Sequence, residues 1–328
     1  MGERIRIGIV GYGNLGRGVE AAIGQNPDCE LGGIFTRRDP AQVRPAAAGT
    51  PVHRLDGIDA FADRLDVLVL CGGSRDDLPV QSPALARRFC IVDSFDTHAR
   101  IEAHFAAVDE AARAGGKVAL IAAGWDPGLF SLERLLGEAI LPRGATYTFW
   151  GSGLSQGHSD AIRRVPGVKA GVQYTVPSEA AIERVRAGER PTLSAQEAHR
   201  RVCWVVLEEG ADAERVRAEI VSMPHYFAGY ETTVHFVDEE TLRRDHAAMP
   251  HGGFVLRSGT TGDGSEQLVE YRLRLGSNPA FTASVLVACA RATCRMHARG
   301  ERGARTLFDV PPALLSPRSP EALRRELL

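Results

Sequence analysis

The segment that most constrains the fold lies near the beginning of the chain. The apolar run IRIGIV at residues 5–10 predicts a buried strand, and GYGNLG at residues 11–16 follows it with the spacing G-x-G-x-x-G. A strand that ends in such a turn and continues as a helix leaves N–H groups unpaired at the helix N-terminus, where a pyrophosphate can bind. Gly11 permits the tight turn, Gly13 lets the phosphates approach, and Gly16 lets the helix pack on the strand. The pattern predicts a dinucleotide-binding unit.

The end of the next predicted strand indicates which nicotinamide cofactor is bound. Residues 30–35 form a second strand-like run, and Thr36-Arg37-Arg38 follows it. An NAD enzyme has an acidic residue here that hydrogen-bonds the ribose 2′-hydroxyl, and that carboxylate would repel a 2′-phosphate. Arginine instead binds phosphate through charge-assisted, often bidentate hydrogen bonds. The sequence therefore predicts NADP; the competing interpretation is a glycine-rich turn beside two solvated arginines.

Composition limits the class of protein. A chain of 328 residues, 44% of them hydrophobic, can bury a large core and is long enough for two domains. Its 39 basic and 41 acidic side chains give no strong field for nucleic acid or an anionic membrane, which favours a small-molecule substrate. No apolar stretch is long enough to span a bilayer, and residues 1–6 lack the apolar core of a signal peptide. We expect a cytoplasmic protein.

The cysteines indicate neither disulfides nor a metal site. The six are Cys29, Cys71, Cys90, Cys203, Cys289 and Cys294. They form no C-x-x-C pair, and several lie within apolar runs, which favours buried free thiols.

The first 127 residues alternate between strand and helix. Apolar runs predict strands at residues 5–10, 30–35, 67–71, 90–95 and 118–123, and helical patterns occupy residues 15–25, 81–88 and 100–114. Nearly continuous apolar strands separated by helices are typical of a buried parallel sheet with right-handed crossovers. The sequence predicts an α/β fold whose first domain, residues 1–127, is a doubly wound, Rossmann-type sheet. Residues 38–54, rich in Pro and Ala, are expected to be irregular.

After Gly124 the predicted strands outnumber the helices. Strand-like stretches occupy residues 145–150, 171–176, 201–207, 230–237, 253–258 and 267–275, and helical patterns occupy residues 129–141 and 214–221. This order favours a second, α+β domain over residues 128–278, built on a mixed or antiparallel sheet. A long helix at residues 280–298 is apolar on much of its surface. We therefore expect residues 279–328 to pack back on the first domain.

Two carboxylates lie where chemistry is expected. Asp96 follows the fourth predicted strand and Asp126 follows the fifth, and ligands of open parallel sheets bind beyond the carboxyl ends of the strands. A pair of carboxylates there suits a cationic substrate group such as an ammonium. The alternatives are a helix N-cap for Asp96 and a turn-forming role for Asp126 before Pro127. Spacing does not decide between them.

Other polar residues are open to two interpretations. Gln156 and Gly157 lie in the glycine-containing segment GLSQGHSD, which could contact a ligand or form a loop before a helix capped by Ser159. His251 lies beside glycines and could be a turn residue. The run His199-Arg200-Arg201 is typical of a solvated face, and isolated tryptophans such as Trp125 and Trp150 pack in cores more often than they line a pocket.

Motifs along nearly the whole chain resemble the meso-diaminopimelate D-dehydrogenase family. They are GYGNLG, IFTRR, DSFD, GWDPG, FWG, GLSQGHSDA, RRVPGV, QYT, MPHGG and NPAFTAS, in this order. The resemblance implies an NADP-dependent oxidoreductase that oxidatively deaminates the D centre of meso-2,6-diaminopimelate to L-2-amino-6-oxopimelate and ammonia. The reverse reaction, a reductive amination, would supply diaminopimelate for lysine biosynthesis and the cell wall. The resemblance also implies a homodimer whose second domain carries the dimer contact and part of the substrate site.

The resemblance implies site residues by position. Cofactor-binding residues would be Gly11, Tyr12, Gly13, Asn14, Leu15, Gly16, Thr36, Arg37, Arg38, Cys71, Gly72, Gly73, Ser74, Ser94, Phe95, Asp96, Ala123, Gly124, Trp125, Asp126 and Pro127. Substrate-binding residues would be Asp96, Asp126, Trp150, Gln156, Gly157, Thr175, Arg201, His251 and Asn278, with Asp96 and Asp126 catalytic. This chain has Ala122-Ala123 where family members often have Ser or Thr, and a longer loop after Arg38.

Three alternative functions remain at this stage. A broader D-amino acid dehydrogenase of the same fold would keep every motif above. A non-catalytic NADP-sensing module would need no paired aspartates beyond adjacent strands. Dihydrodipicolinate reductase is a two-domain enzyme of the same pathway, but its basic histidine motif is missing from this sequence.

Overall fold

The computed structural model describes residues 4–328, and of Gln156 it describes only the backbone. The chain divides into two compact units. The first contains the residues up to Leu132 together with Pro279–Leu328, and the second is Glu133–Asn278. The last long helix therefore belongs to the same unit as the N-terminal sheet.

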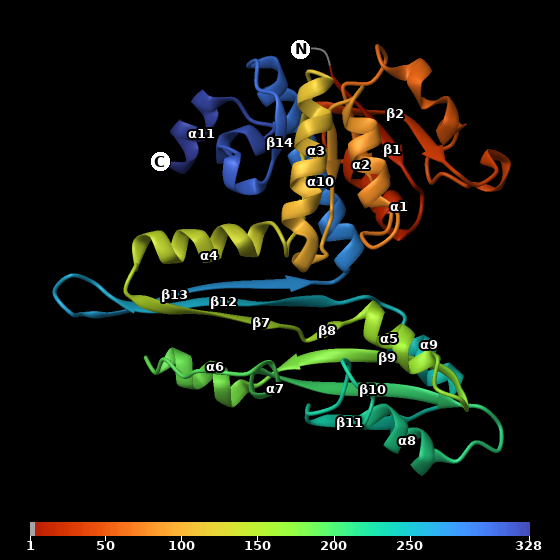
Figure 1. The fold of residues 1–328 in the computed structure, drawn as a ribbon, viewed down its shortest axis with the longest axis vertical. Coiled ribbons are helices and arrows are strands. Elements are labelled where there is room, and N and C mark those ends of the chain that lie inside the picture. Colours follow the sequence, from red (N-terminus) through yellow and green to blue (C-terminus); the bar gives the residue numbers. More distant parts are fainter. Residues whose placement is uncertain (1–3) are drawn as a thin grey trace. The chain divides into compact units, whose positions relative to one another are not determined.

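The first unit is built on a parallel sheet with the strand order β14-β6-β5-β4-β1-β2-β3. Figure 1 labels β1, β2 and β14 of this sheet. The strands are β1 (Ile5–Val10), β2 (Cys29–Thr36), β3 (Val52–Arg54), β4 (Val67–Leu70), β5 (Ile91–Asp93), β6 (Val118–Leu120) and β14 (Gly303–Arg305). All neighbouring strands are parallel. The order reverses between β1 and β4, which is the switch point of a doubly wound sheet. The predicted Rossmann-type α/β fold is confirmed.

The two edge strands of this sheet are the part that the sequence did not predict. Residues 38–54 were expected to be irregular, but β3 lies within them and pairs with the end of β2, and β14 pairs with β6. Each of the two has three residues, which is too short for a hydrophobic period to be recognised.

Helices cover both faces of the sheet. Those of the first unit are α1 (Asn14–Gly24), α2 (Leu78–Ala86), α3 (Ile101–Ala114), α10 (Asn278–Ala298), α11 (Pro320–Leu327) and the 3₁₀ turns η1 (Pro40–Gln42), η2 (Leu55–Phe61), η3 (His98–Arg100), η4 (Leu307–Asp309) and η5 (Pro312–Leu315). Successive strand residues point to opposite faces. Ile9 and Val69 pack with residues of α1 and α10, whereas Val10 and Leu70 pack with residues of α2 and α3. No helix in the described residues is long and apolar enough to cross a membrane.

Arg291 links α10 to the segment between α1 and β2. Only 1% of it is exposed, and its guanidinium donates to both carboxylate oxygens of Asp28, at 2.5 and 2.8 Å, and to Asn26 Oδ1 at 2.6 Å. A further N–H donates to the Leu315 carbonyl at 2.9 Å. A buried charge is tolerated when it is paired and hydrogen-bonded in this way.

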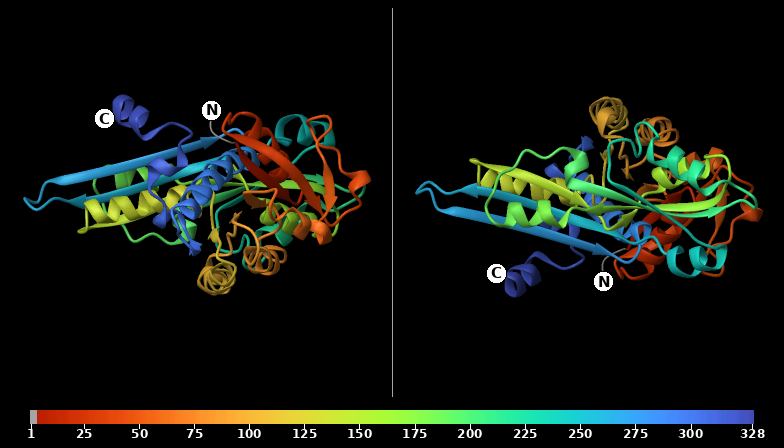
Figure 2. Two further views of the ribbon diagram at one scale, coloured as in Figure 1. Left: turned by 90° about the horizontal axis from the view of Figure 1, so that it is seen from above. Right: turned by 90° about the horizontal axis from the view of Figure 1, so that it is seen from below.

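The second unit contains two separate sheets. The strands are β7 (Gly144–Trp150), β8 (Gly153–Leu154), β9 (Val168–Pro177), β10 (His199–Leu207), β11 (Thr232–Phe236), β12 (His251–Thr260) and β13 (Glu266–Leu275). One sheet has the order β11-β10-β9-β8 and is mixed, because only β10 and β11 are parallel; the other, β13-β12-β7, is antiparallel. Figure 2 shows β12 and β13 as one long hairpin. The expected α+β architecture is confirmed.

The helices of the second unit include three that the sequence analysis did not predict, namely α6 (Glu179–Arg186), α7 (Ala195–Ala198) and α9 (Glu239–His246). The others are α4 (Leu129–Ile140), which begins in the first unit, α5 (Gln156–Arg163) and α8 (Ala213–Val221). The proposed cap at Ser159 is wrong. Ser155 is the N-cap of α5, and the Ser159 hydroxyl donates back to the Ser155 carbonyl at 2.6 Å from inside the helix.

Candidate active site

The turn between β1 and α1 is shaped by its glycines. Gly11 has a φ of +90°, and its N–H donates to the Phe35 carbonyl at 2.8 Å. A Cβ on Gly16 would lie 2.3 Å from the Gly11 carbonyl oxygen, so a larger residue could not pack there. Gly13 is the N-cap of α1. Within the described part of the chain no side chain caps this helix, and the space around the Cβ position of Gly13 is open to 4 Å. The first N–H groups of α1 can thus receive an anion.

A pocket of about 260 Å³ lies beside this turn. It is lined by Val10, Gly11, Tyr12, Gly13, Phe35, Thr36, Arg37, Arg38, Leu55, Cys71, Gly72, Gly73, Asp77 and Gln81. These residues come from the ends of β1, β2 and β4 and from the first turns of α2 and η2. The structure therefore brings the GYGNLG turn, the Thr36-Arg37-Arg38 segment and residues 71–73 to one pocket.

Both arginines of this pocket are already oriented. Arg38 donates to the Tyr12 carbonyl at 2.6 Å, and its backbone N–H donates to Thr36 Oγ1 at 3.1 Å. Arg37 forms an ion pair with Asp77 at 2.7 Å, although two-thirds of its side chain is exposed. A guanidinium has five N–H donors, so both groups can bind a phosphate as well.

One residue that supports the pocket, Glu20, was not identified from the sequence. Glu20, on α1, accepts hydrogen bonds from the Tyr12 hydroxyl and from the backbone N–H groups of Ala46 and Ala47, the latter two at 3.0 Å. It thereby holds the loop after Arg38 against α1. The sequence around an acidic residue in the middle of a helix does not indicate that it will bind a distant loop.

Asp96 lies at the carboxyl end of β5 with an exposed carboxylate. Its N–H donates to Ser74 Oγ at 2.9 Å, and the same oxygen accepts from the Thr97 N–H at 3.2 Å. The N-cap interpretation of Asp96 is wrong, because Thr97 precedes η3 and α3 begins only at Ile101. Ser74 therefore fixes the backbone that carries the Asp96 carboxylate.

Asp93 connects the loops that carry the two candidate catalytic residues. It is fully buried, and its Oδ1 accepts from the Phe95 N–H at 3.1 Å and from the Ala122 N–H at 3.0 Å. Its Oδ2 accepts from Ser82 at 2.6 Å and lies 2.8 Å from His104 Nε2. One carboxylate thus ties the end of β5 to the start of the loop that contains Asp126. Asp126 itself is half-buried, next to Pro127.

In the second unit, Arg201 is a cation that is almost fully buried. Only 8% of it is exposed, one N–H donates to Thr175 Oγ1 across the β9–β10 pair, and the guanidinium carbon lies 4.1 Å from the centre of the Tyr230 ring. Among the described residues it forms no ion pair with a carboxylate, and its Nε is buried without a hydrogen-bond partner. The solvated-face interpretation of residues 199–201 is wrong for Arg201 and His199, because both are buried.

Trp150 is held by His199. The backbone N–H of Trp150 donates to His199 Nε2 at 2.9 Å, and the two rings stack with their centres 5.4 Å apart. His199 is 5% exposed, whereas Trp150 is 38% exposed at the end of β7. The indole is therefore presented at the surface of its unit by a buried partner that the sequence analysis did not single out.

The remaining predicted residues of this unit lie around Gly153. Gly153 pairs with Thr175, and a Cβ on Gly153 would lie 2.4 Å from the Cγ of His251. The backbone N–H of Asn278 donates to the carbonyl of Met249 at 2.9 Å, and Met249 lies two residues before His251 in the sequence. Gly157 is exposed in the first turn of α5, and the side chain of Gln156 lies outside the described structure. Trp150, Thr175, Arg201 and His251 thus gather where β7, β8, β9, β10 and β12 meet.

Two histidines near Arg201 should make the protein acid-sensitive. Burial, assisted by the charge of Arg201, lowers the pKa of both His158 and His199 from 6.5 to about 4. A depressed pKa means that the unfolded chain takes up protons first, so stability is complete above pH 6.5 and falls as the pH drops toward 4. At roughly 1.4 kcal/mol per pKa unit, each histidine costs about 3 kcal/mol over that range. Denaturant unfolding between pH 7.5 and 4.5 measures this, and His199→Gln should give a shallower dependence; an equal slope would contradict it.

No metal cluster is evident among the described residues, because no group of three or more His, Cys, Asp or Glu side chains could hold an ion. All six cysteines are free. Burial raises the pKa of Cys71, in the cofactor pocket, to about 12, so this thiol is neutral and unreactive near pH 7.

Residues 124–277 match the family model described as the diaminopimelic acid dehydrogenase C-terminal domain. A curated relative, meso-diaminopimelate D-dehydrogenase from Ureibacillus thermosphaericus, is 60% identical over 326 residues, which covers 99% of this chain and 100% of that protein. This chain belongs to the meso-diaminopimelate D-dehydrogenase family. Membership rests on nearly the whole sequence, including the pocket of the first unit and the Arg201 cluster of the second.

Two solved structures of the family are informative about the site. A sixfold variant of the Clostridium tetani meso-diaminopimelate dehydrogenase, crystallised with DAP, is 51% identical with a TM-score of 0.92 and covers 99% of this chain and 100% of that one. An engineered D-amino acid dehydrogenase bound to NADP⁺ is 46% identical with a TM-score of 0.84 and the same coverage. The residues replaced in the sixfold variant have the identities, order and spacing of Gln156, Thr175, Arg201, Pro250, His251 and Asn278 here. Pro250 is the one of these that the sequence analysis missed.

Proposed function

We propose that this protein is an NADP-dependent meso-diaminopimelate D-dehydrogenase. It converts the D centre of meso-2,6-diaminopimelate, with NADP⁺ and water, to L-2-amino-6-oxopimelate, ammonia, NADPH and a proton, and it runs in reverse as a reductive amination for lysine biosynthesis. The observation that carries the proposal is Arg201, a buried guanidinium that lacks a carboxylate among the described residues and belongs to a cluster of polar residues. Such a group fits a carboxylate of the substrate.

The residues of the first unit fit NADP. The open N–H groups at the start of α1, next to Gly13, would hold the pyrophosphate, and Thr36, Arg37 and Arg38 would hold the 2′-phosphate. The remaining predicted cofactor residues, from 71–74, 94–96 and 123–127, would line the nicotinamide side. Bound NADP⁺ supplies the hydride acceptor for the substrate Cα–H.

Asp96 and Asp126 are our candidates for the groups that act on the reacting amine. Hydride can leave Cα only when the amine is neutral, so a carboxylate that binds the ammonium and takes its proton prepares the reaction. Holding the amine also orients the Cα–H, and such positioning can remove several kcal/mol of the barrier. Asp93 and Ser74 are positioning residues, because they fix the backbone on which these carboxylates stand.

The distal L centre is assigned to the second unit. Arg201 and Thr175 would bind its carboxylate, and His251 and Asn278 would supply further hydrogen bonds. Trp150, Gln156 and Gly157 complete the proposed substrate set. Because a diamino diacid carries an amino acid group at each end, a fixed anchor for the L end selects which Cα–H reacts.

An activity assay tests the proposal. We expect NADP⁺ reduction with meso-diaminopimelate, little with the L,L-isomer, and slower turnover with D-alanine and D-norleucine. Equal or faster turnover of simple D-amino acids would favour a broader D-amino acid dehydrogenase, and the absence of any turnover would favour a sensor.

Cofactor selection can be tested separately with the double variant Arg37→Ala/Arg38→Ala. A hydrogen bond to a charged group contributes roughly 1.5–3 kcal/mol, so NADP⁺ should bind about a hundredfold more weakly or worse, with NAD⁺ little affected. Titration calorimetry of both cofactors gives the comparison. Equal losses would show that the arginines support the fold and do not bind the phosphate. Arg64→Ala, an arginine of the same unit outside this pocket, is the matched control.

We further propose a homodimer formed through the second domain. Leu135, Leu136 and Ile140 of α4 and Leu268 and Val269 of β13 are exposed, and apolar groups of this kind commonly mark an interaction surface. Leu136→Asp should shift the sedimentation coefficient from that of a dimer to that of a monomer.

We also place the enzyme in the cytoplasm, where its free cysteines would stay reduced.

A further inference from the structure

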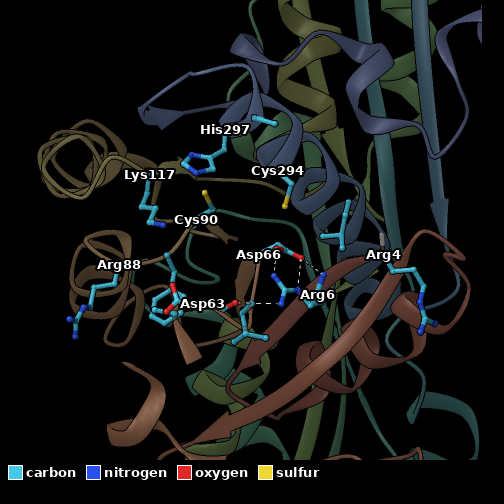
Figure 3. Close-up of a pocket in the computed structure, with 14 residues that line it drawn as sticks. Arg4, Arg6, Asp63, Asp66, Arg88, Cys90, Lys117, Cys294 and His297 are labelled. Carbon is cyan, nitrogen blue, oxygen red and sulfur yellow. Dashed lines mark hydrogen bonds and ion pairs between the residues drawn. The ribbon is translucent and has the colours of Figure 1, made fainter. Parts of the chain in front are cut away.

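A second pocket of the first unit, of about 400 Å³, lies at the amino ends of the parallel strands (Figure 3). It is lined by Arg4, Ile5, Arg6, Ala62, Asp63, Leu65, Asp66, Arg88, Phe89, Cys90, Lys117, Cys294, His297 and Ala298. The pocket proposed for the cofactor uses the carboxyl ends of β1, β2 and β4 and shares none of these residues. The proposed dehydrogenase reaction leaves this second pocket without a role.

Most charges of this pocket are already neutralised. Arg6 donates to Asp66 at 2.8 Å, Arg4 pairs with Glu30 at 2.5 Å, and Arg88 pairs with Asp59 at 2.5 Å. Figure 3 shows the Arg88 and Arg4 side chains directed away from the middle of the pocket. These arginines therefore leave little positive charge unmatched.

Lys117 and His297 are the exceptions. Neither side chain has a hydrogen-bond or ion-pair partner among the described residues, and both are only partly exposed. His297 Nδ1 is buried and unpaired, which is costly for a polar atom. Burial, together with the charges of Arg302 and Lys117, lowers the pKa of His297. This wall of the pocket thus has a positive field and unused donors.

Two carboxylates, Asp63 and Asp66, line the pocket together with two thiols. Burial raises the pKa of the Cys90 and Cys294 thiols, so both are neutral near pH 7. Asp66 is engaged by Arg6 through both carboxylate oxygens, and Asp63 lies exposed on the preceding segment. Phe89, Leu65 and Ala298 add apolar walls. An external anion would therefore find the Lys117 ammonium and the neutral His297 imidazole as donors, and neither has a partner among the described residues.

We propose that this pocket binds a small oxyanion, a carboxylate or a phosphate group, through Lys117 and His297. Lys117 directly precedes β6, and His297 lies at the end of α10. Cys90, which also lines the pocket, directly precedes β5. A ligand bound there would join three elements of the first unit and stabilise it, since a ligand that binds only the folded state raises its stability.

The test is calorimetric titration of the NADP⁺-saturated protein with inorganic phosphate and, separately, with succinate, at constant ionic strength. Saturation with NADP⁺ occupies the proposed phosphate sites of the cofactor. We expect a saturable site that Arg201→Met retains, and a rise in Tm with the preferred anion. Lys117→Gln should weaken binding about tenfold or more and abolish the rise in Tm, and His297→Gln should do so independently if the lysine variant folds poorly.

Lys169→Gln is the matched control, because Lys169 is the only other lysine in the sequence and pairs with Glu239 in the second unit. It should bind the anion like the wild type, as should Arg201→Met. The proposal is overturned if neither anion saturates the wild type, if Lys117→Gln and His297→Gln both bind normally, or if Arg201→Met alone abolishes binding. The last result would assign the anion to the proposed substrate cluster. Comparison of the two anions distinguishes phosphate from carboxylate.

Discussion

Replacement of Arg201 by Met should lower kcat/KM for meso-diaminopimelate by about two to four orders of magnitude, because two charged hydrogen bonds contribute roughly 3–6 kcal/mol. The loss should appear in kcat as well as in KM, since binding energy at the distal end orients the reacting carbon. Arg201→Lys should also be strongly impaired. An ammonium cannot form the bidentate pair, and it would leave the contact with the Tyr230 ring largely unmade.

Stability provides the control for this variant. Burial lowers the pKa of Arg201, which means that its charge is poorly solvated in the folded protein. Arg201 has no carboxylate partner among the described residues, so its removal leaves no opposite charge buried alone, and Arg201→Met should melt at the wild-type temperature or above it. Turnover of D-alanine, which has no distal carboxylate, should fall much less than turnover of meso-diaminopimelate. Equal losses for the two substrates, or none, would contradict the proposal that Arg201 binds the distal carboxylate, and would leave the dehydrogenase proposal in place.

The sequence predicted the central elements of the fold because their signals are local. β1 and β4 are short apolar runs next to turn residues, and the β1–α1 turn has glycines at positions where the structure leaves no room for a Cβ or requires a positive φ. The edge strands β3 and β14 carry no such signal. They exist because the end of β2 and the whole of β6 offer backbone groups to pair with, which is a property of the assembled sheet.

The candidate site was predicted where motifs resemble a known family and was missed where residues act through others. Asp93 precedes Asp96 in the same DSFD turn, yet only the structure shows that it links the Phe95 and Ala122 backbones. His199 and Arg201 were interpreted as part of a solvated run, because a basic tripeptide is usually exposed. Alternation along β10 instead buries both of them and exposes Arg200 between them.

Replacement of Asp96 or Asp126 by Asn should lower kcat/KM by about a hundredfold or more, the usual contribution of a positioned proton acceptor. Asn keeps the size and much of the hydrogen-bonding capacity but cannot accept the proton from the substrate ammonium. For Asp96 we also expect an unchanged Tm, because its carboxylate is exposed and the hydrogen bonds that fix its loop come from Ser74 and Asp93. Asp93→Asn should differ: it changes a buried group with four partners, so both activity and Tm should fall.

This contrast separates a group that touches the substrate from one that only places it. Glu110→Gln, an exposed carboxylate on α3, is the matched control and should leave both kcat/KM and Tm unchanged. NADP⁺ affinity should also be nearly constant in Asp96→Asn and Asp126→Asn, because the groups proposed to bind the cofactor phosphates are the first N–H groups of α1 and the side chains of Arg37 and Arg38. Full activity in both variants would mean that another group deprotonates the amine.

The pH dependence of kcat/KM distinguishes a base from a positioning residue. If one aspartate is the base, its Asn variant should lose the acidic limb of the profile. A variant of a residue that only positions the substrate should keep that limb at a lower rate.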